Sequence, residues 1–267
     1  MKRFFLLLSV VLLPVLALAQ EWKTVNDEGT ALGARVSLGV DKKLAKGLHL
    51  SVAGELRTQD NFAGIGRWQA DVGISYKIGP YVKVGAGYMF IDKLNASSEW
   101  IPRHRFYGDV TGALRLGDWR LSLKERLQLT HRNAEGLNVY QTNPNSLALK
   151  SRLKAEYRGF SAVSPYVSVE ARTVFNDPAC TANWNPTTQS FSDYVFTGYT
   201  DTYFNRFRGM VGMEWKLSRQ HAVDFGVLGD YYYDKEVDTN GAGTKLKSIT
   251  YDRGIRLHAS LGYTFSF

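Results

Sequence analysis

Residues 32–40 read LGARVSLGV, and this stretch decides the fold class. Leu32 and Val40 fall on one side of the alternation, whereas Arg35 and Ser37 fall on the other. Because the side chains of a β-strand alternate between its two faces, a period of two predicts a strand with one apolar and one polar face. The same alternation continues through most of the chain. We expect strands at residues 21–26, 30–41, 48–58, 66–78, 81–92, 103–116, 119–132, 146–158, 163–176, 202–217, 221–234 and 249–267.

The lengths of these segments and of their connections indicate a membrane barrel. Most exceed the roughly 9–11 residues that cross a bilayer as a tilted strand, whereas soluble strands most often have about 5–6. Short connections alternate with long ones, as expected for short periplasmic turns and long extracellular loops. The short ones are 42–47, 79–80, 117–118, 159–162 and 218–220, and the long ones are 59–65, 93–102, 133–145, 177–201 and 235–248. The expected fold is an all-β, transmembrane, antiparallel up-and-down barrel of about 12 strands, or 10 if the first is absent and another pair fuses. Both termini are then expected at the periplasmic end.

A soluble β-sandwich or lipocalin-like barrel is the alternative architecture, because these folds also alternate apolar and polar residues. Two features favour the membrane. Aromatic residues on the apolar faces gather near both strand ends, where lipid interfaces select amphipathic rings. The chain also closes with YTFSF at residues 263–267, and this ending looks like the C-terminal signal read by the barrel assembly machinery.

The first residues indicate export. Lys2 and Arg3 precede an apolar run from Phe4 to Leu18, and residues 17–19 read ALA, a small-x-small cleavage site. The run is too short for an uncleaved membrane anchor. We expect a signal peptide at residues 1–19, one barrel domain at residues 20–267, and a location in the bacterial outer membrane. The net charge of +8 therefore does not predict a nucleic-acid partner, because an exported chain meets none.

An arginine-rich hairpin carries a family resemblance. Residues 103–107 (RHRFY), 117–120 (GDWR) and 123–127 (LKERL), with the signal peptide and the terminal Phe267, resemble a family of small Gram-negative outer-membrane β-barrel proteins catalogued as a domain of unknown function. The resemblance implies an outer-membrane barrel. It implies no functional residues, because the family has no established activity.

The polar columns predict a strongly basic lumen. If the apolar columns face lipid, twenty-one bases and eight acids face inward. The bases are Arg35, Arg57, Arg67, Lys77, Lys83, Arg103, Arg105, Arg115, Arg120, Lys124, Arg126, Arg132, Lys150, Arg152, Lys154, Arg158, Arg172, Arg206, Arg208, Lys216 and Arg256. The acids are Glu55, Asp71, Asp109, Glu156, Glu170, Glu214, Asp224 and Asp230. Pairing across neighbouring strands can neutralise only part of this excess, so the lumen should hold water, anions or both.

This excess motivates a passive channel that favours small anionic solutes, because rings of Arg and Lys lower the barrier for anions. The residues expected to line the pore and set selectivity are Arg105, Arg126, Arg152, Arg206 and Arg208.

A lipid-modifying enzyme is a second hypothesis. Glu125 is charged in the middle of an otherwise apolar column, and Ser151 lies on the apolar column of the next strand. A bulge that turns Glu125 inward toward Arg126 or Lys124 is the favoured structural alternative. The sequence shows no catalytic motif, and we expect no metal or cofactor.

A structural or loop-binding barrel is the third hypothesis. The aromatic-rich segment 177–201 is expected to be a loop that either contacts a partner or folds over the mouth as a plug. The expected partners are outer-membrane lipid and lipopolysaccharide, the barrel assembly machinery through Phe267, and small anionic solutes.

Overall fold

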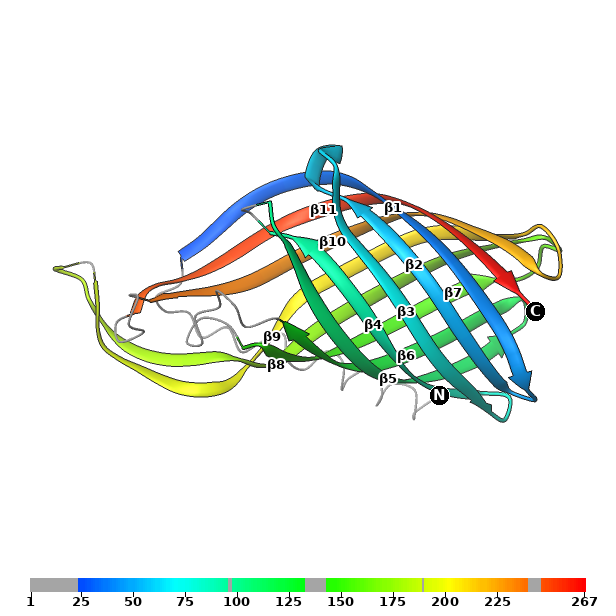
Figure 1. The fold of residues 1–267 in the computed structure, drawn as a ribbon, viewed down its shortest axis with the longest axis horizontal. Helices are drawn as coiled ribbons and strands as arrows, with labels where there is room; N and C mark the ends of the chain where they lie inside the picture. The colour runs from blue at the N-terminus through cyan, green and yellow to red at the C-terminus, as the bar shows by residue number, and fades with distance from the viewer. Residues whose placement is uncertain (1–23, 96–97, 133–142, 189, 240–245) are drawn as a thin grey trace.

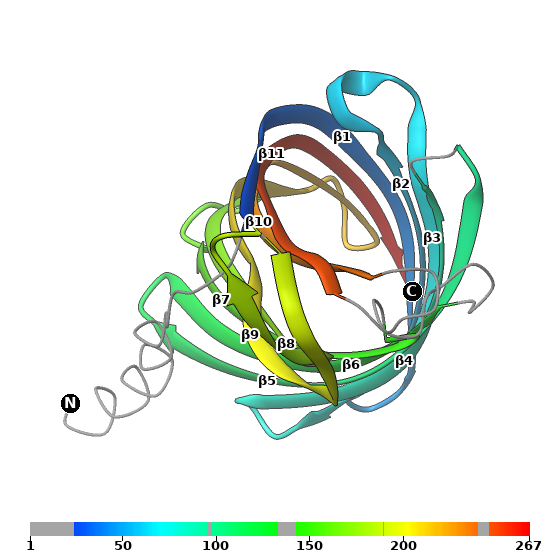
Figure 2. The ribbon, with the colours of Figure 1, turned by 90° about the vertical axis from the view of Figure 1, so that its left-hand side faces the viewer.

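The computed structural model describes residues 24–95, 98–132, 143–188, 190–239 and 246–267, and it forms one closed β-barrel (Figures 1 and 2). Within these residues there are eleven strands and one short 3-10 turn, η2 (Asp60–Phe62). The strands are β1 (Thr24–Ala45), β2 (Leu48–Thr58), β3 (Ile65–Ile78), β4 (Val82–Leu94), β5 (Trp100–Leu116), β6 (Trp119–Arg132), β7 (Asn145–Tyr157), β8 (Val163–Asn185), β9 (Ser190–Lys216), β10 (His221–Thr239) and β11 (Leu246–Ser266). The predicted all-β barrel is confirmed.

The barrel closes by an unexpected pairing. Strands adjacent in sequence pair antiparallel from β1 to β11, but β1 and β11 pair parallel, with Val36 opposite Leu261. Both strands run toward the end where the chain finishes (Figure 1). The described chain therefore begins at the opposite end of the barrel from Phe267, and the expectation that both termini share one end is wrong.

The strand count differs from about twelve because two expected strands are one. Residues 21–26 and 30–41 are expected as two separate strands, yet Thr24–Ala45 is a single strand as far as it is described. The polar segment between them is accommodated as a register shift between Asp27 and Thr30, with Gly29 at φ 71°. A bulge adds a residue without reversing the chain, so one strand is lost from the count.

The register places apolar side chains on the outer wall. Val110 on β5 is 51% exposed and Val211 on β9 is 66% exposed, whereas Asp230 on β10 is only 3% exposed. Aromatic contacts on this wall lie near both ends of the strands. Trp119 and Tyr157 have ring centroids 5.2 Å apart near the turns, and Trp68 and Phe90 are 5.2 Å apart near the opposite end. The predicted orientation of the two faces is confirmed.

The end of the barrel opposite the short turns is built mainly from strand extensions. The segment 177–201 was expected to be a loop, but most of it belongs to β8 and β9, which pair as far as Asn185 and Ser190. This hairpin projects beyond the ends of the neighbouring strands (Figure 1). Several register shifts mark its base, between Arg172 and Ala179. The loop prediction is therefore wrong for this segment.

Three inward tyrosines tie strands that are not neighbours. Tyr107 on β5 donates to Asp71 on β3 at 3.0 Å, and Tyr166 on β8 donates to Asp224 on β10 at 2.9 Å. Tyr232 on β10 similarly donates to Glu28 on β1.

Each of these rings crosses a glycine of the intervening strand. The glycines are Gly87 on β4, Gly212 on β9 and Gly254 on β11. A cation also lies over each ring: Arg126 over Tyr107, Lys154 over Tyr166 and Arg256 over Tyr232. The repeat braces the inner wall, because a missing side chain allows the ring to lie flat against the sheet.

Among the described residues, no helix has the length and apolar character that a membrane span requires. The expected signal peptide at residues 1–19 lies outside the described residues.

Candidate functional site: the inner wall

The five residues expected to line a pore all project from inward columns. Arg105 lies on β5, Arg126 on β6, Arg152 on β7, and Arg206 and Arg208 on β9. Their surroundings divide them into two groups. Arg126 and Arg208 form ion pairs with carboxylates, whereas Arg105, Arg152 and Arg206 form none within the described residues.

In the half of the lumen nearer the short turns, local ion pairs offset part of the positive charge. Asp109 on β5 accepts from Arg126 at 2.7 Å and lies 3.0 Å from the Lys124 ammonium. Glu156 on β7 pairs with Arg158 at 2.6 Å and lies 3.8 Å from Lys154. Acids on one strand thus face bases on the same or the next strand, which is the structural role that cross-strand pairing predicts.

A second network crosses the middle of the wall. Asp230 on β10 accepts from Arg208 on β9 at 2.5 and 3.0 Å, and from Arg35 on β1 at 3.2 Å. Arg208 also lies 3.7 Å from Glu170 on β8, which in turn lies 3.3 Å from the Lys150 ammonium. The network thus links β1, at the parallel closure, to β8 and β9 on the other side of β10.

The arginine cluster lies beyond this network, toward the strand extensions. We define it as Arg57 on β2, Arg67 on β3, Arg105 on β5, Arg172 on β8 and Arg206 on β9. Arg105 lies within electrostatic range of Arg57, Arg172 and Arg206. Arg67 likewise lies within range of Arg57, Arg105 and Arg206. Because β2 and β3 are far from β8 and β9 in the strand order, these guanidinium groups approach one another across the lumen.

Direct cross-strand neighbours in the cluster carry the same charge. Arg57 is opposite Arg67, and Arg172 is opposite Arg206. Like charges directly opposite destabilise a sheet. The stability of the wall therefore does not explain why these four positions are arginines.

Lys93 is an inward base that the sequence-based list of lumen residues omits. Lys93 continues the inner column of β4 and is opposite Arg67. The expected strand ended at residue 92, and extending its alternation by one step would have found this side chain. The inward tyrosines were also missed, since their carboxylate partners lie two strands away.

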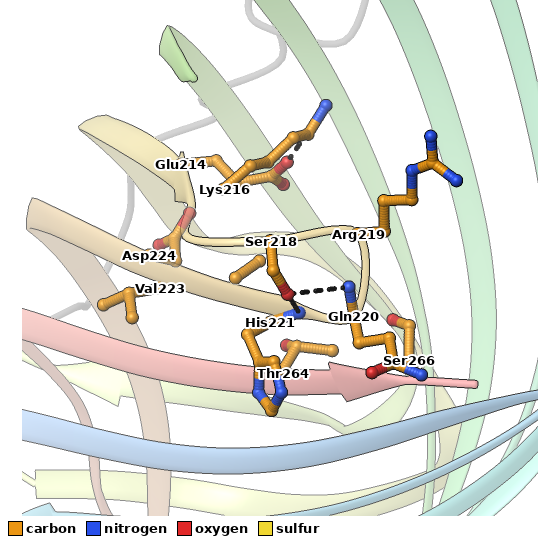
Figure 3. A pocket seen from close by; sticks show the side chains of 11 residues that line it. Glu214, Lys216, Ser218, Arg219, Gln220, His221, Val223, Asp224, Thr264 and Ser266 are labelled. Carbon is orange, nitrogen blue, oxygen red and sulfur yellow. Dashed lines mark hydrogen bonds and ion pairs between the residues drawn. The ribbon is translucent and has the colours of Figure 1, made fainter.

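A pocket of about 420 Å³ opens at the end of the barrel that carries the short turns (Figure 3). Its lining includes Glu214, Lys216, Arg219 and Asp224. Ser218 accepts hydrogen bonds from the backbone amides of Gln220 and His221 at 3.1 and 3.2 Å, which fixes the β9–β10 turn at the rim. Acids and bases are balanced here, in contrast to the arginine cluster.

Glu125 and Ser151 meet on the outer wall. They are directly opposite on β6 and β7, and the Ser151 hydroxyl donates to Glu125 Oε2 at 2.6 Å. Glu125 is also opposite Val110, whose exposure marks the outer face. The registers of β6 with β5 and β7 contain no shift. The favoured bulge that would turn Glu125 inward is therefore absent, and that interpretation is wrong.

No group of three or more His, Cys, Asp or Glu side chains in the described chain could hold a metal ion.

The base of the β8–β9 extension should respond to pH. Asp177 is opposite Asp201, and Asp201 Oδ2 accepts from the Lys235 ammonium at 2.6 Å. Burial, opposed by Lys235 and reinforced by Asp201, raises the pKa of Asp177 to about 6. A raised carboxyl pKa means that the folded hairpin binds the proton more tightly than the unfolded chain. Stability of the extension should therefore decrease as pH rises from about 4 to about 6.

Limited proteolysis of the extension checks this expectation. Asp177→Asn should be cleaved a few-fold more slowly than the unsubstituted protein at pH 7.5 and equally fast at pH 4.5. The ratio of the two cleavage rates, variant over unsubstituted protein, is taken at each pH because it cancels the pH dependence of the protease itself. An equal ratio at both pH values would show that Asp177 does not titrate in this range.

A family model described as a protein of unknown function (DUF2490) matches residues 33–240. The match covers most of the chain, so the protein belongs to this family, and the sequence resemblance to a domain of unknown function is confirmed. No curated protein matches the sequence significantly.

Proposed function

We propose that the protein is an outer-membrane β-barrel that passes small anionic solutes through a lumen narrowed by the arginine cluster. The apolar outer wall, with aromatic contacts near both ends, supports the membrane location because lipid replaces water around it. The observation that carries the anion preference is the cluster itself. Four of its five guanidinium groups make no ion pair with the described residues, and the fifth, Arg57, pairs with Glu55.

The charge of the cluster acts on ions through the low dielectric of the wall. Fixed positive groups without compensating carboxylates lower the electrostatic barrier for anions and raise it for cations. In the turn-side half, Asp109 and Glu156 offset part of the charge of the neighbouring bases, whereas the cluster has only Glu55 as an ion-pair partner among the described residues. Selectivity is therefore concentrated at the level of Arg105, Arg172 and Arg206.

Reversal potential in a planar bilayer under a KCl gradient tests the proposal. The protein should prefer chloride. Replacing Arg105 and Arg206 with glutamine should roughly halve the chloride-to-potassium permeability ratio or reduce it further. Arg126→Gln is the matched control, and its effect should be smaller because Asp109 already offsets that charge. Cation preference, absence of conductance, or an equal response of the two variants would each contradict the proposal.

A lipid-modifying activity is the second candidate, favoured by the hydrogen bond between Ser151 and Glu125 on the outer wall. A carboxylate beside a hydroxyl can act as its base. Phospholipase and deacylase assays on the purified barrel test it, with Ser151→Ala as the inactive comparison. Turnover that survives Ser151→Ala would remove this pair from consideration.

A further inference from the structure

Apart from Arg57, which pairs with Glu55, the arginines of the cluster have no carboxylate partner among the described residues. Arg67 donates to the Gln69 amide oxygen at 2.6 Å, and Arg105 donates to the Thr130 hydroxyl at 2.9 Å. These partners are neutral. The buried Nε atoms of Arg67, Arg172 and Arg206 have no hydrogen-bond partner in the part of the chain that the structure describes. A buried donor without a partner carries a desolvation cost that a bound acceptor would relieve.

The carboxylates within electrostatic range of Arg206 compensate only part of the charge of the cluster. Asp230 lies within electrostatic range of Arg206, but it binds Arg208 and Arg35. Asp234 lies within range of Arg172 and Arg206 and accepts from the neutral Asn205 amide at 2.8 Å, so its charge offsets part of theirs. The five arginines still outnumber Glu55 and Asp234, so the cluster keeps uncompensated positive charge.

Guanidinium groups from opposite walls favour one kind of ligand. Each presents a planar fork that binds phosphate or carboxylate oxygens with two parallel hydrogen bonds. Separate monovalent ions would each lose translational freedom on binding, whereas covalently linked anionic groups lose it once. The arrangement thus favours several linked negative charges over the same number of free ions.

We propose that the arginine cluster is a binding site for a multiply charged anion with at least three linked negative groups, held among Arg67, Arg105, Arg172 and Arg206. This inference rests on the proposed anion path, since the ligand reaches the cluster through the lumen. It adds that the narrow part of this path is also a ligand-binding site. Monovalent anions pass it, and an oligoanion occupies it and blocks them.

Block of the chloride current by inorganic tripolyphosphate tests the inference. The protein is placed in a planar bilayer at about 0.1 M KCl, where screening is moderate. The half-blocking concentration of tripolyphosphate should be at least about 100-fold lower than that of orthophosphate, a difference of about 2.8 kcal/mol in binding. Citrate tests linked carboxylates in place of linked phosphates. Block by tripolyphosphate alone would identify a phosphate site, and block by both a general oligoanion site.

The chain offers a matched control pair. Arg115 and Arg120 are also directly opposite each other and have no ion pair among the described residues, but they flank the short β5–β6 turn. Replacing Arg172 and Arg206 together with glutamine should raise the half-blocking concentration of tripolyphosphate at least about tenfold. The same double replacement of Arg115 and Arg120 should leave it unchanged.

The outcomes separate this inference from the proposed function. Chloride preference with equal block by tripolyphosphate and orthophosphate would overturn the inference and leave the channel intact. If the barrel does not conduct, the channel proposal fails, and calorimetric titration of the detergent-solubilised barrel with tripolyphosphate decides the inference. Binding that is weakened by the Arg172 and Arg206 replacements would support it, and absence of binding would overturn it.

Discussion

Replacing Asp230 with asparagine should lower the free energy of unfolding of the barrel by about 3–5 kcal/mol, which is the usual cost of leaving buried charges without their partner. Asp230 is 3% exposed and binds Arg35, which is 6% exposed, as well as Arg208. Asparagine keeps the shape of the side chain but removes its charge. Two guanidinium groups would then repel each other in a buried position. Urea unfolding in lipid vesicles, followed by tryptophan fluorescence, measures the loss.

Asp224→Asn is the matched control for this prediction. Asp224 lies on the same strand and also faces inward, but its bond comes from the neutral hydroxyl of Tyr166. Losing the charge there should cost only about 1 kcal/mol. A double variant, Asp230→Asn with Arg35→Gln, should recover part of the loss, because Arg35 has no other ion pair among the described residues, whereas Arg208 keeps Glu170. Equal losses at Asp230 and Asp224 would show that the buried ion pairs do not govern the stability of this wall.

The faces of the strands were predictable because a period of two needs only local sequence. The position of Arg105 inside and Val110 outside follows from parity along one strand. Closure was not predictable, because the segment around Gly29 satisfies either a turn or a bulge. The choice between them depends on whether β1 pairs with β11. This pairing is between distant parts of the chain, so no local sequence pattern predicts it.

The chemical environment of each arginine was also beyond the sequence. Arg126 and Arg105 look equivalent as inward bases, yet one faces Asp109 and the other faces Thr130. Which residue falls opposite is decided by register, and a shift of one residue would exchange the faces. The pairing of Glu125 with Ser151 follows the same rule. Register thus determined which charges remain available to a ligand, whereas alternation determined only that they point inward.

The glycines beneath the inward tyrosines should be among the least replaceable positions in the barrel. Gly212→Ala should lower the free energy of unfolding by about 1–3 kcal/mol, the usual cost of overpacking. A Cβ at Gly212 would lie 2.6 Å from the Phe225 carbonyl oxygen and 2.6 Å from the Tyr166 hydroxyl. The carbonyl belongs to the ladder and cannot withdraw, so moving the ring alone does not relieve the clash.

Gly209 on the same strand provides the control. It faces outward, and a Cβ there would meet no atom of the described residues within 4 Å. Gly209→Ala should therefore be neutral or stabilising by about 0.4–1 kcal/mol, because it restricts the unfolded chain without a clash. Urea unfolding in vesicles compares the two variants directly. If Gly212→Ala proved as harmless as Gly209→Ala, the rings would have room to move and the braces between β8 and β10 would contribute little. If it is costly, tyrosine packing on glycine joins the buried ion pairs in holding together a wall that the arginine cluster destabilises.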